Sequence, residues 1–167
     1  MSQMEIRPGL ADVPVAESAV SFIDGQRARL EYRGIPAEVL ARESTFEETA
    51  WLLLKDDLPT QKELIDFKDQ LTHHRRLKYR IIDLMKCLPE TGHPMDALQA
   101  AVSAMAMFYP SRNVSNPTSN WEAVIRLIAK LPTVVAAFHR MRAGDEAIPP
   151  RDDLDHAANF YYMLFEK

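Results

Sequence analysis

The sequence predicts an all-α fold preceded by one small β-hairpin near the N-terminus. Three stretches carry the spacing of a helix capping box, in which a Ser or Thr stands three positions before a Glu. They are Ser44 with Glu47 (or Thr45 with Glu48), Thr60 with Glu63, and Ser119 with Glu122. After residue 34, segments that alternate apolar and polar residues as a half-buried strand does are nearly absent. Both observations favour helices for residues 35–167.

A single apolar helix is predicted for residues 92–109, GHPMDALQAAVSAMAMFY. Pro94 suits the first helical position, and Asp96 lies near the positive end of the helix dipole. No further charged residue occurs before Arg112. A helix that is apolar around its whole circumference is buried, but this one is shorter than the roughly 20 residues that span a bilayer. We therefore expect a central helix that is packed closely on several sides.

The N-terminal region divides into two parts. Residues 1–18 contain two prolines and a glycine and are predicted to be an extended arm. Residues 19–34 are predicted to be the hairpin, because Asp24-Gly25 is a strong signal for a two-residue turn with positive φ at both positions. The residues after this turn alternate between charged and apolar types, which is typical of a half-buried strand.

Residues 35–167 are predicted to be helical, with breaks at prolines and polar loops. Pro132 lies inside the long helix that begins near Ser119 and is expected to kink it. Asp152 and Asp153 are expected to open the last helix. The expected helices cover residues 37–42, a segment that includes 50–54 and is broken at Leu58-Pro59, a segment that leads from Thr60 into 64–71, and then roughly 78–87, 92–109, 121–142 and 154–165.

Composition excludes several classes of protein. The chain has 167 residues, of which 47% are hydrophobic and 26% charged, which fits one globular domain or a large piece of a bigger one. Its net charge of −4 gives no reason to expect a nucleic-acid partner or an anionic membrane. We find no transmembrane segment and no apolar leader at the N-terminus. The single cysteine, Cys87, fits a reducing cytoplasm and is expected to be a small core residue.

No catalytic or metal-binding constellation is found from spacing alone. His73 and His74 are adjacent, so on a helix they point about 100° apart and do not bind one metal ion together. We interpret the basic run from His73 to Arg80 as a solvated helix end rather than a phosphate site. A glycine-rich phosphate loop is absent from the sequence.

The order of several segments resembles bacterial citrate synthases, and among them the cyanobacterial type. The segments include SFIDGQ with LEYRGIP, FEETAWLLL, HHRR with GHPMDALQA, AKLPTVVAAF, and PRDDLDHAANFYYML. They run from end to end of the chain and match roughly the N-terminal 40–45% of the family's enzyme. The resemblance implies the large-domain helices of that all-α fold, incomplete in residues 35–167. It also implies an acyltransferase of the tricarboxylic acid cycle, which condenses acetyl-CoA with oxaloacetate to give citrate and CoA.

The resemblance also carries expectations about individual residues. In some family members the arginine of the (Y/F)-R-G segment contacts a CoA phosphate, which here is Arg33. His93 matches a histidine that contributes to an effector site in NADH-inhibited members, but we favour a structural role for it at the start of its helix. The family's catalytic His and Asp residues would all follow Lys167, so no catalytic residue, metal or resident cofactor is expected here. Acetyl-CoA is a substrate.

The helices at 92–109 and 121–142 are expected to be antiparallel neighbours that form the interface of a homodimer or higher homo-oligomer. Their small residues permit a close approach, and the corresponding family helices pair across the dimer two-fold axis. Two alternatives stay open. In the first, the chain would be a non-catalytic helical self-association module. In the second, it would be a fragment of a 2-methylcitrate synthase, which would use propionyl-CoA.

Overall fold

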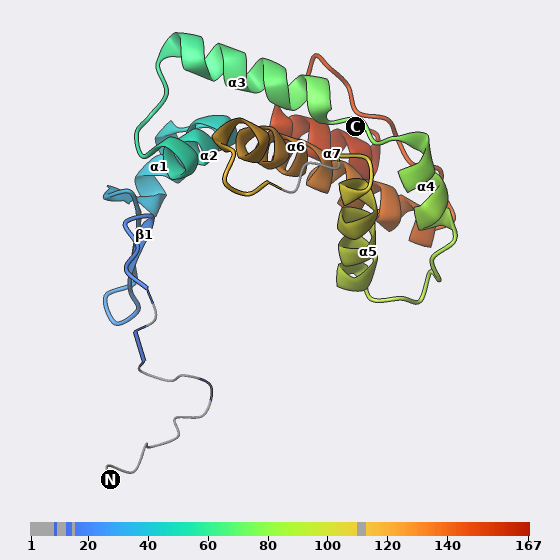
Figure 1. Ribbon diagram of the computed structural model, residues 1–167, viewed down its shortest axis with the longest axis horizontal. Helices are drawn as coiled ribbons and strands as arrows, with labels where there is room; N and C mark the ends of the chain where they lie inside the picture. The colour runs from blue at the N-terminus through green and yellow to red at the C-terminus, as the bar shows by residue number, and fades with distance from the viewer. Residues whose placement is uncertain (1–8, 10–12, 15, 110–112) are drawn as a thin grey trace. The chain divides into compact units, whose positions relative to one another are not determined.

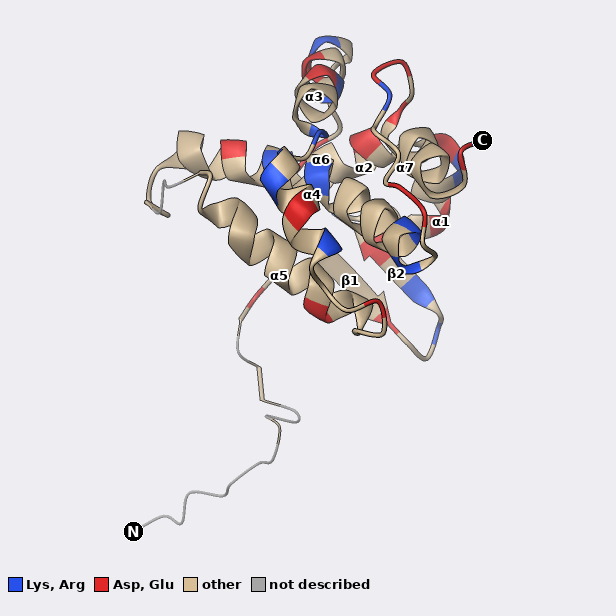
Figure 2. Ribbon diagram, turned by 90° about the vertical axis from the view of Figure 1, so that its right-hand side faces the viewer, with Lys and Arg blue, Asp and Glu red and all other residues tan. Residues whose placement is uncertain are grey.

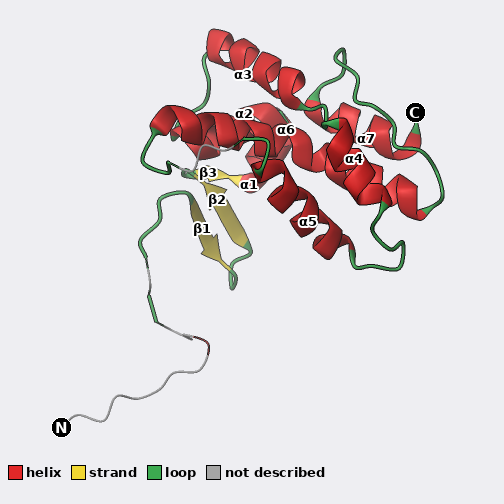
Figure 3. Ribbon diagram, turned by 45° about the vertical axis from the view of Figure 1, so that its right-hand side comes forward, coloured by secondary structure: helices red, strands yellow, loops and turns green. Residues whose placement is uncertain are grey.

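The computed structural model describes residues 9, 13–14, 16–109 and 113–167. Within them, seven helices follow three short strands, which confirms the predicted all-α fold with an N-terminal hairpin (Figure 3). Most of the arm predicted for residues 1–18 lies outside the described residues. The elements are β1 (Ser21–Asp24), β2 (Arg29–Tyr32), β3 (Ile35–Pro36), α1 (Ala37–Glu43), α2 (Phe46–Lys55), α3 (Gln61–His74), α4 (Tyr79–Lys86), α5 (Pro94–Ala106), α6 (Pro117–Arg142) and α7 (His156–Phe165).

The chain divides into two compact units. The first comprises residues 1–45 and 49–58, and the second comprises residues 46–48 and 59–167. The division passes through α2, whose first turn belongs to the second unit while the remainder belongs to the first.

The first unit contains an antiparallel sheet in the order β1-β2-β3. The hairpin is confirmed, but the expected two-residue turn at Asp24-Gly25 is wrong. Asp24 pairs with Arg29, which leaves a four-residue loop between the strands, and the positive φ of 52° occurs at Ala28. The Asp24 carboxylate accepts hydrogen bonds from the N–H groups of Gln26 and Arg27, both at 3.1 Å. This side chain closes its own turn, which favours the longer loop.

The second unit is organised around α6, which contacts α3, α4, α5 and α7 (Figure 1). The sequence analysis expected the helix at 92–109 to hold that central place. The longer helix does so instead, because its 26 residues include buried small side chains along its length, among them Ala129, Ala136 and Ala137. Helix α6 runs through Pro132 without interruption. A core cluster joins α4, α5 and α6, and its buried members are Ile81, Met85, Ala97, Ala101, Met105, Val134, Ala137 and Phe138.

Helix α5 buries one stripe of side chains in the described chain. Ala97, Ala101 and Met105 are spaced four residues apart, so they lie on the face that meets the core. Met95 and Met107 are exposed on other faces. Figure 2 shows the ribbon of α5 almost entirely tan, with the acidic residue near its start. The helix is therefore apolar around its circumference, as predicted, but it is not covered on every side within one chain.

Helices α5 and α6 run antiparallel, as predicted. One cavity is lined by Met95 and Leu98 from the start of α5 together with His139 and Arg142 from the end of α6. A second cavity is lined by residues from the end of α5 and the first half of α6. The two helices therefore contact each other along most of their length.

Two of the predicted helix starts are corrected by the structure. Helix α6 begins at Pro117 and is capped by Asn116, whose side-chain oxygen accepts from the N–H groups of Thr118 and Ser119. Ser119 is therefore inside the helix, and Glu122 pairs with Arg126 one turn later. An Asn followed by a Pro at the first helical position is a stronger start signal than the predicted capping box.

The last helix starts later than predicted. Asp155, and not Asp152 or Asp153, is the N-cap of α7, and its carboxylate accepts from the N–H of Ala158 at 2.7 Å. Asp152 and Asp153 lie before the helix and pair with Arg76 and Arg151. Three aspartates stand within four positions in this segment, so acidic charge alone does not show which of them caps the helix.

The remaining caps agree better with the sequence. Thr60 and Glu63 form the predicted capping box of α3, with both reciprocal hydrogen bonds present. Helix α2 begins at Phe46, which leaves Thr45 at the capping position, whereas Ser44 is the C-cap of α1. The alternative box of Ser44 with Glu47 is therefore wrong.

Replacing Ala101 by Leu should lower the free energy of unfolding by about 1–3 kcal/mol, because Ala101 is 0% exposed and the added side chain overpacks the core between α5 and α6. Denaturant unfolding of the purified chain measures this change. The same substitution at Ala106, which is exposed on the same helix, is the matched control and should change stability little. Equal effects at the two positions would contradict this packing.

Candidate functional site

Arg33 lies at the end of the sheet in the first unit, in a left-handed conformation with a φ of 48°. Its side chain is 17% exposed and forms an ion pair with Asp56. Its Nη2 donates to the carbonyl oxygen of Leu53 at 3.3 Å. Because Leu53 belongs to the last turn of α2, the guanidinium also interacts favourably with the negative end of that helix. Arg33 therefore has structural partners, and its contact with a CoA phosphate stays a prediction.

The basic run that follows α3 is not a solvated helix end at every position. Arg75 is only 2% exposed and is the largest fully buried side chain among the described residues. Its Nη1 donates to the carbonyl oxygens of Arg151 at 2.6 Å and Leu154 at 2.9 Å, and its Nη2 donates to the hydroxyl of Thr72 at 3.1 Å. The interpretation as a solvated end is therefore wrong for Arg75. It fits Arg76, whose side chain is half exposed and pairs with Asp152.

A second buried cation, Lys130, comes from the middle of α6 and is 5% exposed. Its Nζ donates to the carbonyl oxygens of His74 at 2.5 Å and Arg76 at 2.6 Å. The hydroxyl of Thr133, one turn later, donates to the carbonyl oxygen of Arg75 at 2.9 Å. Three consecutive carbonyls at the end of α3 are thus satisfied by two side chains of α6. We call this set, Arg75, Lys130 and Thr133, the buried cation cluster.

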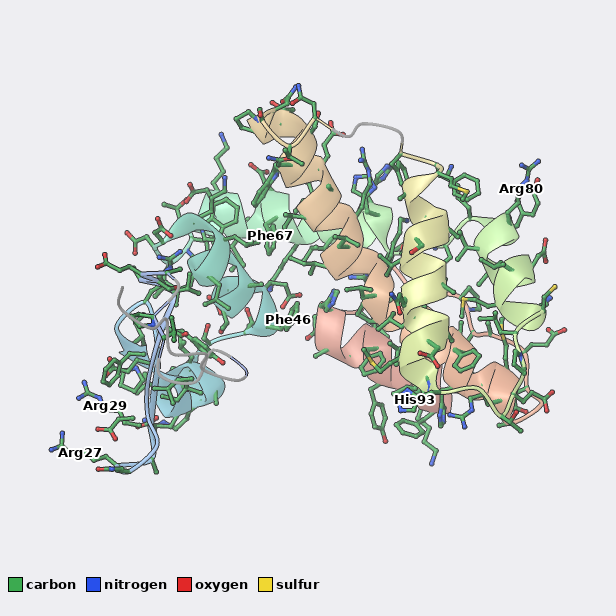
Figure 4. The ribbon with its side chains drawn as sticks, turned by 60° about the horizontal axis from the view of Figure 1, so that its bottom comes forward. Arg27, Arg29, Phe46, Phe67, Arg80 and His93 are labelled. Carbon is green, nitrogen blue, oxygen red and sulfur yellow. The ribbon has the colours of Figure 1, made fainter. Side chains whose placement is uncertain are left out.

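The buried cation cluster fixes the segment that leads into α7. The N–H of Arg151 donates to the side-chain oxygen of Asn159 at 2.9 Å, so the segment is also held from within α7. The buried carboxylate of Glu47, from the first turn of α2, accepts from the N–H of His156 at 3.1 Å. Phe46 stacks on the His156 ring with centroids 4.5 Å apart, and Figure 4 labels Phe46 where α2 begins.

Burial, together with the positive charges of Lys78 and Arg126, lowers the pKa of the Lys130 amine to about 8. Burial also lowers the pKa of His74, and the neighbouring charges of His73 and Lys130 act in the same direction. A cavity of about 250 Å³ lies beside this region between α5 and α6, and its lining includes Arg126 and Lys130. Arg126 is already paired with Glu122, and Lys130 with backbone carbonyls, so we assign no ligand to this cavity.

The other residues singled out from the sequence have clear positions. His93 caps α5, and its Nδ1 accepts from the N–H of Met95 at 3.2 Å, which confirms the structural role (Figure 4). Cys87 is exposed at the end of α4, so its assignment to the core is wrong. Its helix buries Ile81 and Met85, and Cys87 falls off that stripe. In the part of the chain that the structure describes, no group of His, Cys, Asp and Glu is arranged to hold a metal ion.

None of the helices in the described ranges is long and apolar enough to cross a membrane.

Comparison with known proteins decides the family. The family model described as citrate synthase, C-terminal domain, matches residues 9–167. The chain belongs to the citrate synthase family. It is 53% identical to the citrate synthase of Synechocystis sp. over 161 residues, which cover 96% of this chain and 41% of that enzyme. It is 44% identical to the citrate synthase of Acidithiobacillus ferridurans, with 98% of this chain and 44% of that enzyme covered.

Solved citrate synthases share the fold. The crystal structure from Thermotoga maritima matches with a TM-score of 0.83 at 38% identity and covers 98% of this chain and 42% of that one. The structure from Pyrobaculum aerophilum matches with a TM-score of 0.84 at 37% identity and covers 95% of this chain and 42% of that one. The chain thus spans about two fifths of the length of these relatives, and the expected resemblance to a cyanobacterial citrate synthase is confirmed.

The buried polar residues were missed by the sequence analysis. Lys130 and Thr133 fall within the segment AKLPTVVAAF, which supported the resemblance to citrate synthases. A lysine in so apolar a stretch is the feature of the sequence that could have indicated a buried charge. Arg75 carries no such signal, since it stands among five other basic residues between positions 73 and 80. Glu47 was assigned to a capping box, whereas it accepts a hydrogen bond from a residue 109 positions away.

Replacing Lys130 by Met should lower the free energy of unfolding at neutral pH by about 2 kcal/mol, because the carbonyls of His74 and Arg76 lose a charged donor. The pH dependence should change as well. The folded chain releases the Lys130 proton near pH 8, whereas an unfolded lysine holds its proton to about pH 10. Between these pH values the unfolded state binds more protons than the folded state. The free energy of unfolding of the wild type should therefore rise with pH in this range.

Denaturant unfolding at several pH values measures both effects. The matched control is Lys62→Met, since Lys62 is exposed in the first turn of α3. This control should keep the wild-type stability at neutral pH and the wild-type slope above it. If the free energy of unfolding of Lys130→Met also rose with pH in this range, the titrating group would not be Lys130.

Proposed function

We propose that this chain is the N-terminal part of a citrate synthase subunit, an acyltransferase of the tricarboxylic acid cycle. The complete subunit would condense acetyl-CoA with oxaloacetate to give citrate and CoA, with acetyl-CoA as a substrate rather than a resident cofactor. The observation that carries this proposal is 53% identity to a citrate synthase along 96% of the chain. We further propose that it works in the cytoplasm, where its single cysteine, Cys87, stays reduced.

The described residues contribute the scaffold of this enzyme rather than its chemistry. Condensation requires a base for the acetyl methyl proton, an acid for the enol oxygen, and cations for the oxaloacetate carboxylates. By resemblance, the residues with these roles follow Lys167. The ionisable groups buried in the second unit are instead bound to backbone carbonyls and N–H groups, which supports a structural role for them.

We also propose that the chain self-associates as a homodimer or higher homo-oligomer through α5 and α6. Exposed apolar side chains on these two helices support this proposal, among them Met95, Leu127 and Val135. A groove with Pro94 and Leu98 on one wall and Val134 and Val135 on the other runs between the helices. In a two-fold interface each such patch would meet its own copy.

A sample of the 167-residue chain, with its mass confirmed, should release no thiol from acetyl-CoA and oxaloacetate above background. Its catalytic partners are absent, and general acid–base groups alone contribute about 10²–10⁴-fold to such reactions. Light scattering on the same sample should give more than the mass of one chain. Turnover by this chain would overturn the placement of the active site, and a single-chain mass would overturn the interface.

Arg33 gives a separate test of CoA binding. Replacing Arg33 by Gln should weaken the binding of CoA by about tenfold or more, because a charged hydrogen bond to phosphate is lost. Calorimetric titration of the active enzyme with CoA measures this. Asp56→Asn is the informative partner variant, since it frees the guanidinium from its ion pair and should strengthen the binding of CoA. Loss of binding in both variants would instead indicate a purely structural Arg33.

A further inference from the structure

Three ionisable side chains are buried together where α2 and α7 begin. Glu47, Arg75 and His156 are each less than 7% exposed. Glu47 and Phe46 come from the first turn of α2, Arg75 follows α3, and His156 is the first residue of α7. All of them belong to the second unit. We call this set of four residues the α7 junction.

The uncharged imidazole of His156 fits the α7 junction. Its ring is stacked on Phe46 with only 6° between the two planes, as two neutral rings pack. Its backbone N–H donates to Glu47, whose carboxylate also faces the positive end of α7. Both contacts tie the start of α7 to the first turn of α2.

A positive charge on His156 would lie close to charged groups of both signs, one that repels it and two that attract it. Arg75, which follows α3, presents a buried guanidinium that repels this charge. From α2, Glu47 would attract the charge, as would Asp155 at the cap of α7 itself. An imidazolium would also compete with its own backbone N–H for the Glu47 carboxylate.

The balance of these groups disfavours protonation in the folded chain. Burial lowers the pKa of His156, and Arg75 lowers it further, while Glu47 and Asp155 act in the opposite direction. A histidine in the unfolded chain keeps its ordinary pKa, so below about pH 6.5 the unfolded state binds the additional proton. The α7 junction therefore loses stability as the pH falls through the range in which histidines titrate.

We propose that His156 is an acid-sensitive switch, whose protonation releases the start of α7 from the first turn of α2. Release breaks the hydrogen bond to Glu47 and the stack on Phe46. The carbonyls of Arg151 and Leu154 stay bound to Arg75, so the segment before α7 remains attached while the first turn of the helix opens. This regulation goes beyond the proposed condensation and requires no substrate.

Hydrogen exchange followed by mass spectrometry tests the proposal on the purified protein between about pH 8 and about pH 5, after correction for intrinsic exchange rates. In the wild type, peptides covering 156–165 and 46–55 should lose protection on acidification, while a peptide covering 94–106 should not. In His156→Phe the ring still stacks on Phe46 but cannot titrate, so protection should stay constant. His73→Phe, at an exposed position of α3, should behave as the wild type does.

Two results would overturn the proposal. One is loss of protection in His156→Phe at the same pH as in the wild type. The other is simultaneous loss in all three peptides, which would indicate global acid unfolding. If His156→Phe does not fold, nuclear magnetic resonance of isotope-labelled histidines in the wild type decides. The His156 ring should titrate below the ordinary histidine pKa of about 6.5 and together with the loss of protection, and titration at the ordinary value would exclude the switch.

Discussion

The buried guanidinium of Arg75 is the interaction on which the second unit depends. A buried charge is expensive unless every donor around it finds a partner. Arg75 meets this requirement at Nη1, which donates to the carbonyls of Arg151 and Leu154, and at Nη2, which donates to Thr72. Its Nε is buried without a hydrogen-bond partner among the described residues, and its own carbonyl accepts from Thr133. One residue thereby joins the end of α3, the middle of α6 and the approach to α7. Removing it would leave these carbonyls without a donor inside the core.

The helical part of the fold follows closely from local patterns. The Thr60 capping box and the His93 and Pro94 start of α5 were predicted correctly, because each depends on residues within one turn. The errors arose where two local signals competed. Asn116 with Pro117 defines the start of α6 in place of Ser119, and Asp155 defines the start of α7 in place of Asp152. In such cases the start of the helix is set by the one residue that caps it, and composition does not show which residue that is.

The candidate site was predictable only in part. Arg33 was identified through resemblance, but its partners are Leu53 in the last turn of α2 and Asp56 just after that helix, and no periodicity connects them to Arg33. The buried cation cluster was missed altogether. Six basic residues lie between positions 73 and 80, and only the three-dimensional packing selects Arg75 for burial. Charge and spacing identify such a basic run, but they do not show which of its residues is buried.

The choice of backbone carbonyls as partners has a consequence for how this family varies. Arg75 and Lys130 bind main-chain oxygens of Arg151, Leu154, His74 and Arg76, and every amino acid provides such an oxygen. The side chains at those four positions can therefore change during evolution without disturbing the contacts. These hydrogen bonds constrain the two cations and not the side chains at the four carbonyl positions, so they give no reason to expect correlated substitutions between the paired positions. Contacts of this kind stabilise the second unit while remaining invisible to covariation between sequences.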